Sequence, residues 1–125
     1  MIKITVDEAY AFDYHSILVL KNKNGFLSSE IVKIATEDLE NSLGKDFTKK
    51  ILDSKEYKDL FEANQLTFEA VDKAKDDSVK ASYVDKCNYK RMIAKKNLQL
   101  SFFNTKLTEN KIGYNKYDTN ENMSN

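Results

Sequence analysis

Apolar residues recur at helical spacing along most of this chain, and a few glycine, serine and aspartate residues mark where one helix ends and the next begins. Thr5 and Glu8 form a capping-box pattern at the start of the first helix. Gly44 is placed to end the second helix. We therefore predict five helices, over residues 6–23, 29–43, 46–52, 54–77 and 79–107, after a short extended lead-in at residues 1–4.

The predicted fold is all-α, a four- or five-helix bundle. Its last two long helices form a C-terminal hairpin, and the first helix packs against the last. A chain of 125 residues suits one domain with one core. We assign residues 1–112 to a single helical domain and residues 113–125, which are polar and aperiodic, to a flexible tail.

The helix over residues 54–77 carries its apolar side chains on one side, as a helix does when it covers a core. This apolar sector runs from Tyr57 at one end to Val71 near the other. Asn64 falls inside it. Because buried polar groups are nearly always paired, we expect Asn64 to find a hydrogen-bonding partner in the interior.

The last helix differs, because it has two apolar faces on nearly opposite sides. Cys87 and Leu98 belong to one face, and Ile93 and Leu100 belong to the other. Cys87 is therefore expected to be an inert core residue. A helix with two apolar faces is packed on two sides, by other helices of the chain or by a second subunit. The pattern predicts a homodimer formed through helix faces.

The last helix also carries a cluster of cations. Residues 86–106 hold six basic residues and no acid, whereas residues 53–77 hold eight acids and four bases. Wound into a helix, the cations are spread around it, which favours charge complementarity between the two arms of the hairpin. The alternative is a nucleic-acid-binding face. Its contacts would be Lys86, Lys90, Arg91, Lys95 and Lys96.

A carboxylate in the apolar sector of the first helix, Asp13, needs a partner, because an unpaired buried charge is costly. Arg91 borders an apolar face of the last helix, and its planar guanidinium suits a carboxylate. We predict a semi-buried pair between them, with Asn88 adjacent, that fixes the register of the two helices. In a functional version of this hypothesis the pair lines a small polar pocket of an enzyme. A tyrosine would complete that pocket, namely Tyr10, Tyr14 or Tyr89.

Composition narrows the possible functions. Lys plus Arg and Asp plus Glu both number 20, and this balance argues against a general attraction to nucleic acid or membranes. A single cysteine and a single histidine exclude a disulfide framework and most transition-metal sites. His15 projects away from the main apolar sector, so we expect it at the surface or partly covered. We find no nucleotide-binding or hydrolase motif, no signal peptide and no membrane span. A cytoplasmic protein without enzymatic activity, cofactor or metal is expected.

Three segments carry a resemblance to known sequences: VDEAYAFDYHSIL, SYVDKCNYKRMIAKKNLQ and NKIGYNKY. They are similar to small uncharacterised proteins of A/T-rich, T4-like marine phages. The resemblance implies a protein of phage or environmental origin that acts in a host cell. It implies the role of a small helical accessory protein that works by binding another protein. We therefore predict protein–protein association as the function, with nucleic-acid binding as the alternative.

Overall fold

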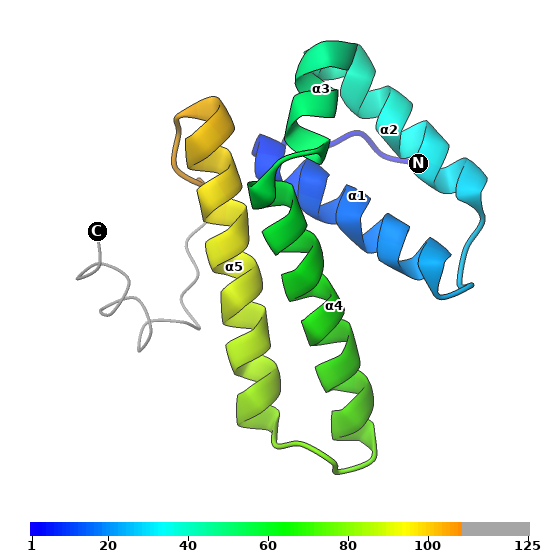
Figure 1. The fold of residues 1–125 in the computed structure, drawn as a ribbon, viewed down its shortest axis with the longest axis vertical. Coiled ribbons are helices and arrows are strands. Elements are labelled where there is room, and N and C mark those ends of the chain that lie inside the picture. The colour runs from blue at the N-terminus through cyan, green and yellow to red at the C-terminus, as the bar shows by residue number, and fades with distance from the viewer. Residues whose placement is uncertain (109–125) are drawn as a thin grey trace.

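The computed structural model describes residues 1–108 and contains five α-helices in that part of the chain (Figure 1). The predicted all-α fold is confirmed. Residues 109–112 of the predicted domain and the predicted tail at residues 113–125 lie outside the described residues. The helices are α1 (Glu8–Lys23), α2 (Ser29–Leu43), α3 (Lys45–Leu52), α4 (Lys55–Lys75) and α5 (Ala81–Phe103).

Helices α4 and α5 form the predicted antiparallel hairpin (Figure 1). Helix α4 begins after Ser54, whose hydroxyl accepts a hydrogen bond from the Tyr57 amide at 3.1 Å. This is a standard N-cap, which satisfies an amide that the first turn would leave unpaired. Helix α5 is shorter than predicted, because it ends where Asn104 adopts the left-handed conformation at φ 54°. Asparagine tolerates that conformation better than most residues, so it acts here as the stop signal.

The start of α1 also differs from the prediction. The helix begins at Glu8 rather than Val6, and the capping box between Thr5 and Glu8 does not form. The side chains of Asp7 and Glu8 instead make contacts with residues far along the chain. Asp7 accepts hydrogen bonds from the Thr108 amide at 2.7 Å and the Thr108 hydroxyl at 3.0 Å, and Glu8 accepts one from Gln99 at 2.9 Å. These contacts tie the start of α1 to the segment at and beyond the end of α5.

The core lies where α1 crosses the upper half of the hairpin (Figure 1). Phe12, Ile51, Leu60 and Leu98 are completely buried there. Helices α2 and α3 follow α1 in the chain, and α2 packs against α1 as well. The predicted packing of α1 against α5 is confirmed, and α1 is covered on most of its sides.

The other half of the hairpin extends beyond the remaining helices (Figure 1). Residues 71–83, at its tip, include no buried side chain. For that reason the apolar sector predicted for α4 is buried only in part. Tyr57 and Leu60 lie in the core, whereas Val71 is 41% exposed.

Candidate functional site

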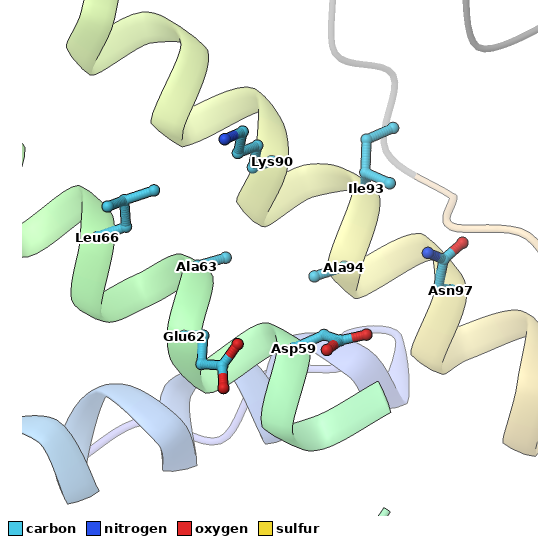
Figure 2. A pocket seen from close by; sticks show the side chains of 8 residues that line it. All are labelled: Asp59, Glu62, Ala63, Leu66, Lys90, Ile93, Ala94 and Asn97. Atoms are coloured by element: carbon cyan, nitrogen blue, oxygen red, sulfur yellow. The ribbon is translucent and has the colours of Figure 1, made fainter. Parts of the chain in front are cut away.

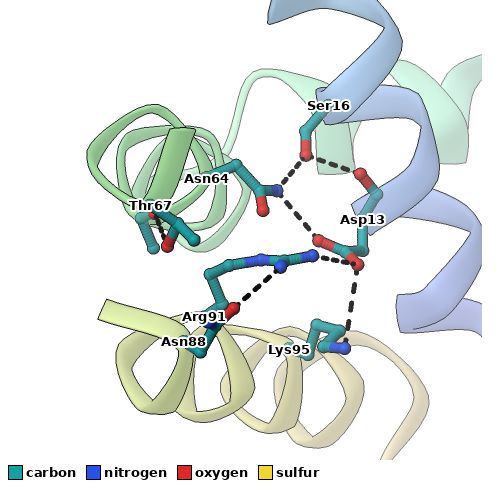
Figure 3. A network of polar contacts seen from close by, with 8 residues as sticks. Asp13, Ser16, Asn64, Thr67, Asn88, Arg91 and Lys95 are labelled. Atoms are coloured by element: carbon teal, nitrogen blue, oxygen red, sulfur yellow. Dashed lines mark hydrogen bonds and ion pairs between the residues drawn. The ribbon is translucent and has the colours of Figure 1, made fainter. Parts of the chain in front are cut away.

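A network of polar side chains in the interior is centred on Asp13, which is only 7% exposed (Figure 3). One carboxylate oxygen accepts a hydrogen bond from the Asn64 side chain at 2.8 Å. The other oxygen lies 3.3 Å from Nη2 of Arg91 and 3.7 Å from Nζ of Lys95. Arg91 also donates to the side-chain oxygen of Asn88 at 3.1 Å. The structure thus brings Asp13, Asn88 and Arg91 together, as predicted from the sequence.

Asn64 has the interior partners that were expected for it. Its amide group donates to Asp13 and, at 2.6 Å, to the Ser16 hydroxyl, which in turn donates to the backbone carbonyl of Asp13 at 2.7 Å. Sequence reasoning missed Ser16 and Lys95 as members of this network. The available signal was spacing, because Arg91 and Lys95 are four positions apart and therefore face the same side of α5.

The five cations proposed as nucleic-acid contacts do not lie on one surface. Lys95 is only 8% exposed, and its ammonium group lies 4.4 Å from the centre of the Tyr10 ring in addition to its contact with Asp13. Arg91 is turned toward the same carboxylate, with 24% of its side chain exposed. Treating Lys95 as a surface contact was wrong, because the buried charge of Asp13 draws it inward. Arg91 remains partly exposed and pairs with the same carboxylate. Lys86 and Lys90 are exposed, and Lys96 is partly buried.

A pocket of about 230 Å³ lies beside this network, between α1 and α4, and Arg91 from α5 contributes to it. Neither Asp13 nor a tyrosine belongs to its lining, so this pocket is not the tyrosine-containing one that the enzyme hypothesis expected. We call it the Arg91 pocket. It is lined by Ile17, Leu20, Lys21, Asn64, Thr67, Phe68, Val71, Asp72, Lys75 and Arg91.

A second cavity, of about 330 Å³, is a groove along the hairpin (Figure 2). Ala63 and Ala94 point toward each other across its floor, and the acidic side chains in its lining come from α4, whereas its one cationic side chain, Lys90, comes from α5. We call it the α4–α5 groove. It is lined by Asp59, Glu62, Ala63, Leu66, Lys90, Ile93, Ala94 and Asn97.

His15 is buried, with 5% of its surface exposed, so the expectation of a surface or partly covered residue was wrong. Thr36 donates its hydroxyl proton to the Val32 carbonyl, so it accepts from Nε2 of His15 at 2.8 Å. That bond leaves Nδ1 to accept from the Tyr57 hydroxyl at 2.7 Å. Burial lowers the pKa of His15 and raises that of Tyr57, which favours the neutral form of both groups. Helix α2 supplies the cover that the sequence pattern of α1 could not reveal.

Three further observations concern the described part of the chain. Cys87 is 2% exposed and has the buried position expected for it. Among residues 1–108 there is no cluster of three or more side chains of the types that usually hold a metal ion. None of the helices formed by these residues combines the length and the apolar character needed to cross a lipid bilayer.

The chain matches no model of a known protein family, and comparison with curated proteins and with solved structures gives no match either. Its function must therefore be inferred from the geometry of the network, the pocket and the groove.

Proposed function

We propose that this protein is a non-enzymatic accessory protein that acts by protein–protein association and forms a homodimer through the α4–α5 groove. The observation that carries the proposal is the groove itself, which has a floor of small residues and edges of opposite charge. The phage-type resemblance of the sequence fits the same role.

The shape of the groove suits a helix. Alanines at its floor let a second helix approach closely, and the partly buried side chains of Leu66 and Ile93 provide apolar contacts. On the same side of α5, Leu100 is 45% exposed. The two helices are each about 30 Å long and about 10 Å wide, so this face approaches the roughly 800 Å² per partner of a stable interface.

The charges along the groove favour a second copy of the chain as the partner, in one particular orientation. A two-fold axis parallel to the helices places α4 of one copy opposite α5 of the other, at the same height. The acidic edge, with Glu62, then faces Lys90 of the partner, and the reverse contact forms by symmetry. A two-fold axis across the helices would instead place the acidic α4 against itself, which is unfavourable.

A pair of charge reversals tests this arrangement. Lys90→Glu alone sets acid against acid across the proposed two-fold axis, and Glu62→Lys alone sets base against base. Each variant should therefore be monomeric, whereas an equimolar mixture should form a heterodimer in which both contacts are attractive. The readout is mass by size-exclusion chromatography with light scattering, where one chain is 14.4 kDa. Lys33→Glu, an exposed reversal on α2, is the matched control and should stay dimeric.

A wild-type protein that remains monomeric at high concentration would overturn the homodimer. A dimer that both single reversals leave intact would show that a different face is used. Ile93→Lys tests the apolar part of the same interface and should also yield a monomer.

Nucleic-acid binding competes with this proposal only through Lys86, Lys90 and Lys96, since Arg91 and Lys95 face Asp13. A gel shift at low salt that weakens steeply with added salt would favour it. A binding curve unaffected by Lys90→Glu would exclude this surface.

A further inference from the structure

We propose that the Arg91 pocket binds a small organic carboxylate with a short apolar tail. The pocket opens on the other side of the hairpin core from the α4–α5 groove, and the two cavities share no lining residue. The proposal therefore goes beyond association and does not depend on it. It starts from the hydrogen-bond donors of Arg91 that the chain leaves unused.

Arg91 is poorly satisfied by its own chain. A guanidinium has five N–H donors. In the described part of the chain Arg91 makes two hydrogen bonds, and the one to Asp13 is long for a charge-assisted bond, at 3.3 Å. Its Nε is buried without a hydrogen-bonding partner. Figure 3 shows the guanidinium extending from α5 toward Asp13, beside Asn64. A planar carboxylate is the ligand whose two oxygens match such an under-used fork.

Two further polar groups of the lining, Asn64 and Thr67, present only acceptor oxygens to the pocket, so they shape its floor and give a carboxylate no hydrogen bond. Asn64 uses its amide protons on Asp13 and Ser16, and its side-chain oxygen makes no hydrogen bond to residues 1–108. The Thr67 hydroxyl donates to the Ala63 carbonyl at 2.8 Å, which leaves its lone pairs available. Both residues are buried, with 3% and 7% of their surfaces exposed. The floor of the pocket is thus built from side chains held in fixed positions, and Arg91 is the residue of this floor that supplies donors for the anionic head.

The side chains of the pocket walls and rim indicate the polarity, charge and size of the ligand. Ile17, Leu20, Phe68 and Val71 supply apolar contacts. The charged residues in the lining are three cations and one acid, so the pocket favours a negative charge; they are Lys21, Lys75, Arg91 and Asp72. A volume of about 230 Å³ is below that of typical drug-sized sites, roughly 300–1,000 Å³. The combination describes an anionic head and a tail of a few carbons.

Titration with sodium hexanoate tests the proposal, followed by amide chemical shifts in ¹H–¹⁵N NMR spectra. Saturable shifts should be concentrated in α1 around Ile17 and in α4 between Asn64 and Lys75. Hexan-1-ol has the same tail without the charge, and inorganic phosphate has charge without the tail. Both should bind more weakly than hexanoate.

Two variants localise the site. Val71 is 41% exposed, so Val71→Glu should fold and should weaken hexanoate binding about tenfold or more by placing a like charge at the rim. Arg91→Lys keeps the charge but removes the planar fork, and it should also weaken binding. The matched control is Ile34→Glu, the same kind of substitution at a 46% exposed site on α2, which should leave binding unchanged.

The proposal is overturned if hexanoate does not saturate, or if Val71→Glu and Arg91→Lys both bind it as wild type does. Equal binding of hexan-1-ol would reduce the pocket to an apolar cleft, and equal binding of phosphate would reduce it to a general anion site. Both of these results also contradict the assignment.

Discussion

Replacing Asp13 with asparagine removes the charge that holds the buried network together. The carboxylate lies 3.3 Å from Arg91 and 3.7 Å from Lys95. At an effective dielectric constant of about 20, these contacts correspond to gross attractions of about 5 and about 4.5 kcal/mol. Desolvation of the three ions offsets much of this in the native protein. In the variant the cations stay desolvated while the attraction is lost, so the expected fall in unfolding free energy is about 3–5 kcal/mol.

Removing the cationic partner, Arg91, should lower the unfolding free energy less than removing the charge of Asp13. Arg91→Met leaves Asp13 with Lys95 and Asn64 as partners, and the methionine chain replaces part of the lost packing. Adding Arg91→Met to Asp13→Asn should restore part of the stability, because one uncompensated cation is removed. The double variant should therefore lose less than the sum of the single losses, by about 0.5–3 kcal/mol.

Urea unfolding followed by circular dichroism measures all three variants. Glu37→Gln, the same carboxylate-to-amide change at an exposed position of α2, is the control and should leave the midpoint unchanged. A loss below about 1 kcal/mol for Asp13→Asn would place it in the range of surface ion pairs. That result, or strict additivity of the two substitutions, would refute the view of Asp13 as the charge on which the network depends.

Three further predictions concern the interior. Burial lowers the pKa of His15 below its usual value, about 6.5, so the unfolded chain takes up this proton at a higher pH than the folded chain. Stability should therefore fall as the pH drops through about 6.5 and level off below the pKa of the folded state. In urea unfolding measured at several pH values, His15→Gln should remove this fall in the midpoint. Gln99→Leu removes the acceptor of the buried Ala9 amide, 2.8 Å away, and should lower the unfolding free energy by about 1–3 kcal/mol in the same assay. Leu60→Ala opens a cavity at a fully buried site and should reduce stability by about 2–5 kcal/mol; a smaller loss would mean that the core collapses to fill it.

Helical periodicity was enough to predict the all-α fold of residues 1–108 and the hairpin, because apolar spacing depends on which face each helix buries. The helix ends were less predictable. The Thr5–Glu8 capping box was a sound local signal, yet Glu8 bonds to Gln99, which is 91 positions away. A local pattern cannot show that a distant side chain will compete for the same group. The same limit applies at Asn104, whose left-handed conformation follows from where the chain turns back.

The network was partly predictable for a physical reason. Asp13 sits among apolar residues, so it had to have a partner, and Arg91 was a cation at the edge of an apolar face. Lys95 occupied a similar edge position, but a lysine there more often extends its ammonium group to water. His15 was misplaced because its burial depends on α2, which contributes Thr36 from 21 positions along the chain. The apolar spacing within α1 does not show which face of α1 the helix α2 will cover.

Helix α5 contributes residues to both proposed sites, but from different sides of the helix. Ile93 lines the α4–α5 groove and Arg91 lines the pocket, and the two are two positions apart in the sequence, about 200° around a helix. Val71→Glu should therefore leave the oligomeric state unchanged, and Lys90→Glu should leave hexanoate binding unchanged. If either variant altered both readouts, the two faces would be coupled through α5. The Asp13 network is the connection that could carry such coupling, because it joins α5 to both α1 and α4.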